Sequence, residues 1–159
     1  MIRSSKFLFG GIIVLALTAC VGPAEKPSSN TPAPKTVVSK PAPKKPHGKI
    51  SSITLEDFFV LQQSDNALIY DARPVLYYRF GHIPGAINLP KQNCDALIAE
   101  WEPKINAAIS SGKTLVVYCT NPTCPDAKSV AIRLANAGYP VKVISGGWEA
   151  WKESGMPIE

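Results

Sequence analysis

The most strand-like run in this chain of 159 residues is TLVVYC, residues 114–119. The five residues before the cysteine carry no charge, and most of them are aliphatic or aromatic. Runs of this kind are typical of strands that are buried on both faces, as in a parallel sheet covered by helices. The run therefore predicts a buried strand over 114–118, with Cys119 just past its carboxyl end.

Strand and helix signals alternate on both sides of this run. Short apolar runs predict further strands over 67–71 and 141–144. Apolar residues at helical spacing predict helices, which cover about 54–63, 93–109 (divided into two pieces by Pro103), 125–137 (closed by Gly138) and 147–153. This alternation predicts an α/β fold with a parallel sheet, in which ligands bind beyond the carboxyl ends of the strands.

Cys119 is the candidate nucleophile, because it lies past a buried strand in a loop that opens a helix. The N-terminus of that helix supplies a partial positive charge and free N–H groups, which stabilise a thiolate and bind anions. The predicted strand over 67–71 delivers Asp71 and Arg73 to the same edge of the sheet. The sequence therefore predicts that any chemistry is done on Cys119.

Four motifs in this order resemble the rhodanese superfamily along most of residues 50–159. They are DARP at 71–74, GHIPGAINLP at 81–90, VVYC at 116–119, and GGWEAW at 146–151 with GMP at 155–157 behind it. The resemblance implies a single rhodanese-like domain with a five-stranded parallel sheet flanked by helices. It also implies that Cys119 takes sulfane sulfur from a donor as a persulfide, that Asp71 and Arg73 organise the site, and that 81–90 is a structural turn.

The loop after Cys119 departs from the common rhodanese form. In that form an Arg or a similar residue stands about five positions after the cysteine, where this chain has Cys124. Pro122 and Pro125 have no backbone N–H to donate to an anion. At Pro125 the missing donor costs little if this proline is the first residue of the helix. We predict a substrate-binding loop of Thr120, Asn121, Thr123, Cys124, Lys128 and Ser129. Related phosphatases and arsenate reductases need an Arg in this loop, and none stands between Cys119 and Arg133.

The other cysteines leave alternatives open. Cys124 is a possible redox partner that closes a disulfide with Cys119 or attacks its persulfide, or else only a loop residue. Cys94 is expected to be a half-buried residue at a helix start. A zinc site of Cys119, Cys124 and His82 lacks the usual paired-cysteine spacing, so neither a metal nor a cofactor is expected.

The N-terminal segment predicts export and lipid anchoring. Residues 1–19 read as a lipoprotein signal peptide, with a basic start, a short apolar run and the sequence LTAC at 17–20, which resembles a lipobox. Cys20 is therefore the predicted lipidation site. Residues 20–49 form a Pro- and Lys-rich linker that we expect to be a disordered tether. We therefore expect the protein to lie in the cell envelope. In Gram-negative cells we expect it on the outer membrane, facing the periplasm, because the residue after the cysteine is Val21 rather than Asp.

The basic residues gather in the N-terminal third, which argues against nucleic-acid binding. From residue 50 onward nine Lys/Arg face eleven Asp/Glu, although the whole chain carries +5. We therefore predict a membrane-anchored sulfurtransferase with a small sulfur donor and a thiol or cyanide-type acceptor, or a partner protein in the envelope. The alternatives are a thiol–disulfide redox protein that uses Cys119 and Cys124, and a non-catalytic rhodanese-like binding module.

Overall fold

The computed structural model describes residues 46–159. The predicted signal peptide, the lipidation site Cys20 and nearly all of the predicted linker lie outside these residues. The elements are β1 (Ile50–Ile53), α1 (Leu55–Gln63), β2 (Ala67–Asp71), α2 (Val75–Arg79), β3 (Ile87–Asn88), α3 (Cys94–Glu100), α4 (Glu102–Ser110), β4 (Thr114–Tyr118), α5 (Pro125–Asn136), β5 (Val141–Ile144) and α6 (Gly147–Glu153). Within 46–159, none of these helices has the length and apolar character needed to cross a bilayer.

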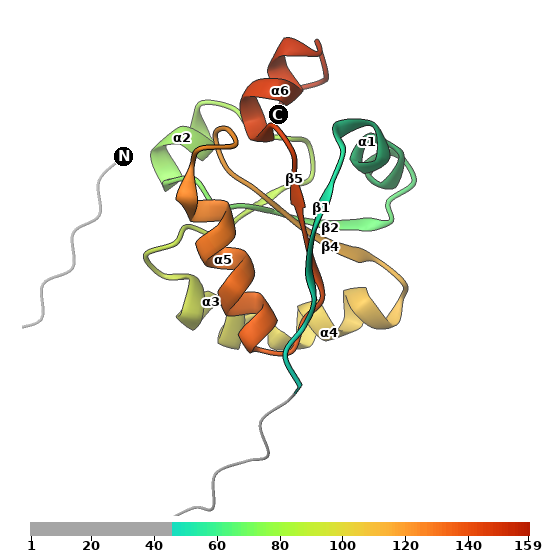
Figure 1. The fold of residues 1–159 in the computed structure, drawn as a ribbon, viewed down its shortest axis with the longest axis vertical. Coiled ribbons are helices and arrows are strands. Elements are labelled where there is room, and N and C mark those ends of the chain that lie inside the picture. The colour runs from blue at the N-terminus through green and yellow to red at the C-terminus, as the bar shows by residue number, and fades with distance from the viewer. Residues whose placement is uncertain (1–45) are drawn as a thin grey trace, which may run out of the picture. The chain divides into compact units, whose positions relative to one another are not determined.

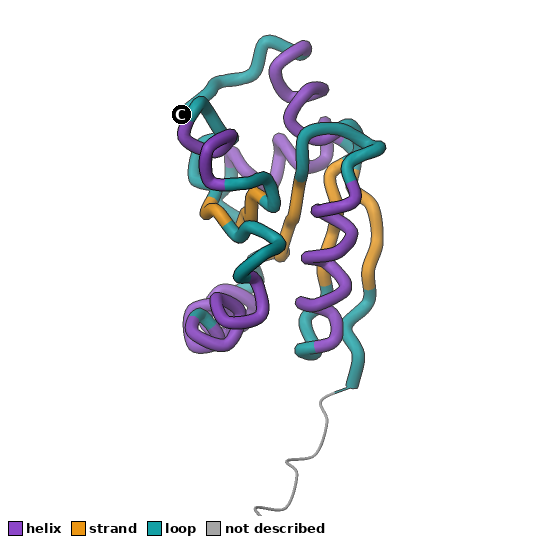
Figure 2. The backbone as a smooth tube through the Cα atoms, turned by 90° about the vertical axis from the view of Figure 1, so that its left-hand side faces the viewer, coloured by secondary structure: helices purple, strands orange, loops and turns teal. Residues whose placement is uncertain are grey.

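The five strands form one parallel sheet in the order β1-β5-β4-β2-β3. Strand β4 lies at its centre, paired with β2 on one side and β5 on the other (Figure 1). The strands lie between layers of helices, as the side view in Figure 2 shows. The predicted fold class, a five-stranded parallel sheet flanked by helices, is therefore confirmed.

The alternating side chains of β4 build two cores, one on each face of the sheet. Leu115 and Val117 belong to a core shared with α3, α4 and α5. Val116 and Tyr118 belong to a second core that contains Phe58 of α1 and two tryptophans of α6. Because successive strand residues point to opposite faces, an uninterrupted apolar run is what a strand covered on both sides requires.

The three strands predicted from apolar runs match the observed bounds, but β1, α2 and β3 were not located from the sequence. Strand β1 lies at the edge of the sheet, and three of its four residues are exposed. Strand β3 has only two residues. An apolar run marks only strands that are buried on both faces, so these short or exposed elements gave no such signal.

The predicted division of the helix over 93–109 is confirmed, but the break lies at Trp101 rather than at Pro103. Helix α3 ends at Glu100 and α4 begins at Glu102, so Pro103 falls in the first turn of α4. Proline is tolerated there, because the first N–H groups of a helix have no partner within the helix.

Candidate active site

Cys119 lies at the carboxyl end of the central strand and is almost fully buried, with 3% of its surface exposed. The first turn of α6 holds the backbone around it. Trp148 N–H donates to the carbonyl oxygen of Cys119 at 2.8 Å, and Glu149 N–H donates to that of Thr120 at 2.9 Å. The position of the cysteine is therefore fixed by β4 on one side and by α6 on the other.

This close approach requires a glycine at position 147. Gly147 has φ +63°, and a Cβ atom on it would lie 2.5 Å from the carbonyl oxygen of Cys119. Glycine alone combines the left-handed backbone with the missing side chain. Part of the GGWEAW motif is therefore explained by the packing of α6 against the cysteine loop.

A disulfide joins Cys119 to Cys124, with 6.1 Å between their Cα atoms. Cys124 is the N-cap residue of α5, and Pro125 is the first residue of that helix, as expected. The loop turns back between the two cysteines, because Cys124 N–H donates to the carbonyl oxygen of Asn121 at 3.1 Å. The chain thus brings Cys124 to the candidate nucleophile.

Cys94 lies apart from this pair. It is the first residue of α3, and it is fully buried rather than half-buried as predicted. The Arg133 guanidinium donates to Cys94 Sγ at 2.9 Å and also to the carbonyl oxygen of Lys91. Cys94 therefore packs in the core beneath α5.

A cavity of about 420 Å³ opens beside the disulfide. Its lining consists of the cysteine loop, the start of α5 and parts of β1 and β5, and comprises Ile50, Ser51, Ser52, Cys119, Asn121, Pro122, Cys124, Ala127, Lys128, Val143, Ile144 and Gly147. Of the predicted loop residues, Asn121, Cys124 and Lys128 line this space together with Cys119.

The other predicted loop residues point elsewhere. Thr120 lines a second cavity, with Arg73 and Trp148. Thr123 is exposed and donates its hydroxyl to Asn121 Oδ1 at 2.9 Å. The Ser129 hydroxyl donates to the carbonyl oxygen of Pro125 within α5, also at 2.9 Å. The structure therefore brings about half of the predicted loop to the cavity at Cys119.

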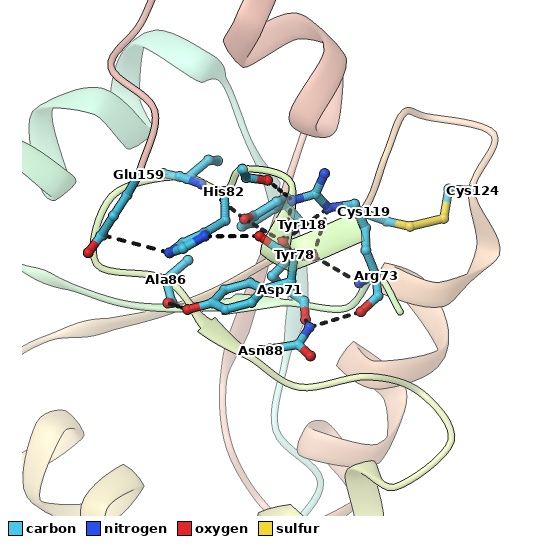
Figure 3. Close-up of polar contacts among 12 residues, drawn as sticks. Asp71, Arg73, Tyr78, His82, Ala86, Asn88, Tyr118, Cys119, Cys124 and Glu159 are labelled. Atoms are coloured by element: carbon cyan, nitrogen blue, oxygen red, sulfur yellow. Dashed lines mark hydrogen bonds and ion pairs between the residues drawn. A yellow bond between two sulfur atoms is a disulfide. The ribbon is translucent and has the colours of Figure 1, made fainter. Parts of the chain in front are cut away.

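Asp71 and Arg73 form a buried ion pair beside the cysteine loop (Figure 3). Arg73 Nη2 donates to Asp71 Oδ2 at 2.6 Å and to the carbonyl oxygen of Gly81 at 2.8 Å. The Tyr118 hydroxyl donates to the same carboxylate oxygen at 2.7 Å and accepts from Ile83 N–H at 3.2 Å. The pair therefore joins the ends of β2 and β4 to the turn that follows α2.

Burial and the Asp71 carboxylate shift the pKa values of Arg73 and Tyr118, the two buried partners of that carboxylate. Burial opposes the charge of Arg73, but the hydrogen bond and the negative charge of Asp71 outweigh it, so the pKa of Arg73 lies above its usual value. Burial, followed by the charge of Asp71, raises the pKa of Tyr118. The Arg73 guanidinium also lies over the ring of Trp148, 4.5 Å from its centroid. Asp71 and Arg73 thus contact Tyr118, which precedes Cys119, and Trp148, whose N–H donates to the Cys119 carbonyl oxygen.

Sequence reasoning assigned no role to Tyr118, Trp148 or the serines of β1. Tyr118 belongs to the predicted strand and to the VVYC motif, but the hydrogen bond of its hydroxyl depends on strand β2 lying beside β4. The GGWEAW motif was a signal for Trp148, but its packing on Arg73 follows only from the tertiary fold. Ser51 and Ser52 line the cavity from an edge strand that was not located.

One group of metal-ligating side chains lies at this site among the described residues. Ligand atoms of Cys119, Cys124 and Asp126 lie within 4.8 Å of one another. The disulfide occupies both sulfur atoms, so this set offers no thiolate to a metal while the bond is formed. His82 lies instead with Tyr78 and Glu159, stacked on the tyrosine ring at 3.8 Å between centroids.

Known proteins resemble this chain over about two thirds of its length. The HTH-type transcriptional regulator Rv0324 of Mycobacterium tuberculosis is 32% identical over 109 residues, which cover 68% of this chain and 44% of the regulator. The 3-mercaptopyruvate sulfurtransferase of Escherichia coli K12 is 28% identical over 129 residues, covering 67% of this chain and 44% of that enzyme. The chain thus spans less than half the length of these two relatives.

Solved structures share the fold. The BH2092 protein from Bacillus halodurans superposes with a TM-score of 0.59 at 24% identity, over 69% of this chain and 76% of that one. The sequence model of the rhodanese-like domain matches residues 54–154, which include strands β2 to β5, the Cys119 loop and the Asp71–Arg73 pair. The protein therefore belongs to the rhodanese-like domain family.

Proposed function

We propose that this protein is a membrane-anchored enzyme of the sulfurtransferase type, which carries sulfane sulfur as a persulfide on Cys119 when the disulfide is reduced. The observation that carries the proposal is the position of Cys119, at the carboxyl end of the central strand and against a cavity of about 420 Å³. Ligands of parallel α/β sheets bind at this end of the strands. The name of the Escherichia coli relative, 3-mercaptopyruvate sulfurtransferase, points to the same chemistry.

The transfer has two steps. The Cys119 thiolate attacks the sulfane sulfur of the donor, a sulfur–sulfur bond forms, and the rest of the donor leaves with the electron pair of the broken bond. A thiol or cyanide-type acceptor then attacks the outer sulfur and restores the Cys119 thiolate. The helix dipole of α5 begins at the loop that holds Cys119, and it favours the negative charge of both the thiolate and the persulfide.

A second function is favoured by the disulfide itself. Cys119 and Cys124 lie five positions apart in the sequence and are bonded in the structure, as in a thiol–disulfide redox protein. Such a protein exchanges electrons with a partner and needs both cysteines. The two functions therefore differ in what they require of Cys124.

Single-turnover loading separates these functions. The reduced full chain in detergent is mixed with thiosulfate or glutathione persulfide, and intact mass and peptide mapping show which cysteine gains sulfur. We expect Cys119→Ser to lose the gain of one sulfur atom and Cys124→Ser to keep it. Cys94→Ala, which alters the buried cysteine beneath α5, serves as the matched control. A wild-type chain that loses only two hydrogens with either donor, and a Cys124→Ser chain that gains no sulfur, would favour the redox function.

We also propose that Cys20 carries the lipid anchor and that the domain faces the periplasm from the outer membrane. The support is the LTAC sequence at 17–20, the basic and apolar residues before it, and Val21. Incorporation of labelled palmitate in cells tests the anchor. Wild type should be labelled and sediment with membranes, whereas Cys20→Ala should be unlabelled. Labelling that survives this substitution would show that the anchor lies elsewhere.

A further inference from the structure

Sulfur transfer through Cys119 needs no second thiol, yet Cys124 is bonded to the nucleophile. We propose that Cys124 is a built-in resolving thiol, which attacks Sγ of persulfidated Cys119 and releases the outer sulfur as hydrosulfide. The inference rests on the proposed function, because it needs a persulfide on Cys119. It adds a reductive branch, in which the protein converts bound sulfane sulfur into hydrosulfide.

The structure shows which sulfur Cys124 reaches. Its Sγ is bonded to Sγ of Cys119, and this bond is the one that attack on the inner sulfur forms. Both ends of the loop are held in place, since the Trp148 N–H donates to the Cys119 carbonyl oxygen and Cys124 directly precedes the first residue of α5. Attack on the inner sulfur therefore requires no rearrangement of the sheet or of α5.

Burial separates the internal attack from attack by an external thiol. Cys119 is 3% exposed in the disulfide form and lines the cavity, so an external donor reaches its Sγ only from the cavity side, and in the persulfide the outer sulfur covers that side. The outer sulfur of a persulfide has the adjoining cavity beside it, where an external acceptor is able to reach it. Transfer to an acceptor and release by Cys124 therefore act on different sulfur atoms and compete for the same persulfide.

The resolving step balances without an added oxidant. The Cys124 thiolate forms a bond to Cys119 Sγ, and the bond from Cys119 Sγ to the outer sulfur breaks. The outer sulfur leaves with that electron pair and takes up the proton that the Cys124 thiol has lost, giving hydrosulfide. The sulfane sulfur is reduced, and the two cysteines are oxidised to the disulfide seen in the structure.

A dithiol reductant then regenerates the site by thiol–disulfide exchange. Cys124 is half-buried, whereas Cys119 is buried, so the reductant has better access to Cys124. Attack there expels Cys119 as the free thiolate, ready for the next donor. The reductive branch thus consumes one sulfane sulfur and one dithiol for each hydrosulfide that it releases.

The experiment follows hydrosulfide and protein mass together under anaerobic conditions. The full chain in detergent is reduced, freed of reductant, mixed with thiosulfate or glutathione persulfide, and passed rapidly through a desalting column. Hydrosulfide is then trapped with a bimane reagent while intact mass is recorded. We expect wild type and the Cys94→Ala control to lose the added sulfur, release one hydrosulfide and form the Cys119–Cys124 disulfide. Release from Cys124→Ser should be at least about ten-fold slower, because intramolecular attack has a high effective concentration.

The outcomes separate this inference from the proposed function. If Cys124→Ser gains no sulfur from either donor, the proposed function fails and the inference fails with it. If the wild-type persulfide is as long-lived as that of Cys124→Ser, the inference is wrong and the proposed function stands. If the disulfide forms equally fast without a donor, residual oxidant rather than the persulfide has produced it, and the inference is again wrong.

Discussion

Gly147 has a left-handed backbone conformation and lies directly against the backbone of the Cys119 loop. Its φ is +63°, and the space that a side chain would need is taken by the carbonyl groups of Cys119 and Thr120. Gly155 has a similar φ of +69° but nothing within 4 Å of an added Cβ. The two glycines therefore allow the cost of the backbone conformation to be separated from the cost of the close approach.

We predict that Gly147→Ala is far more destabilising than Gly155→Ala. The left-handed backbone should cost each variant roughly 1–2 kcal/mol of unfolding free energy. The contact with the Cys119 carbonyl should add about 1–3 kcal/mol in Gly147→Ala alone, and it should slow sulfur loading because the cysteine loop must shift. Urea unfolding and the loading assay measure both effects. Equal destabilisation of the two variants would show that the close approach at position 147 carries no cost.

At the scale of elements, the Asp71–Arg73 pair ties together segments that are distant in the chain. Its hydrogen bonds reach from the end of β2 to the end of β4 and to the turn at Gly81, and Arg73 also packs on α6. Both side chains are buried, with exposed fractions of 0% for Asp71 and 3% for Arg73. A buried pair of this kind stabilises the fold little in itself, but removing one partner leaves a buried charge without its counterion.

We predict that Arg73→Met lowers the unfolding free energy by about 3–5 kcal/mol, because it leaves the Asp71 carboxylate with only neutral donors. The double variant Asp71→Asn, Arg73→Met should be more stable than Arg73→Met alone, because the buried charge is gone while an acceptor for the Tyr118 hydroxyl remains. Urea unfolding of both single variants and the double variant gives the coupling energy. If the two losses simply add, the pair does not act through its buried charge.

At the scale of the whole molecule, buried tyrosines make stability depend on pH. Burial, with a smaller effect of Tyr139, raises the pKa of Tyr70 from 10.0 to about 12. Burial also raises the pKa values of Tyr118 and Tyr78. The folded chain therefore keeps protons that the unfolded chain releases near pH 10. Their contribution to stability is fully present below about pH 10 and is lost as the pH rises through the folded-state pKa values.

We predict that the unfolding free energy falls as the pH is raised from about 9 to 11.5, because the unfolded tyrosines ionise near pH 10. Tyr70→Phe should make this fall shallower. The variant should not lose stability at neutral pH, since among residues 46–159 the buried Tyr70 hydroxyl has no hydrogen-bond partner. Tyr77→Phe, at an exposed tyrosine of α2, is the matched control and should follow wild type. Identical slopes for all three proteins would contradict the linkage.

The sequence by itself determined the fold class, three of the five strands and the position of Cys119 past the central one. These features depend on local patterns. A strand that is covered on both faces must be apolar throughout, and a helix with one buried face must carry apolar residues every three to four positions. Pro125 at the start of α5 and Gly138 at its end followed from residue types with fixed backbone preferences. The resemblance to the rhodanese superfamily implied a sheet of five strands, but it did not locate the other two strands in the sequence.

Only the tertiary structure decided which side chains meet. Asp71 and Tyr118 are 47 positions apart, and their hydrogen bond exists because β2 lies beside β4. The sequence grouped Thr120, Asn121, Thr123 and Lys128 in one predicted loop, but Lys128 lies in α5. Only the tertiary structure directs Asn121 and Lys128 to the cavity at Cys119 and Thr120 to the other. Spacing left the pairing of Cys119 with Cys124 open, because a separation of five residues permits a disulfide but does not require one. The turn at Asn121 and the start of α5 bring the two sulfur atoms together. The N–H groups of Trp148 and Glu149, which are distant in the sequence, hold the Cys119 end of this loop, and such contacts depend on tertiary packing rather than on local preference.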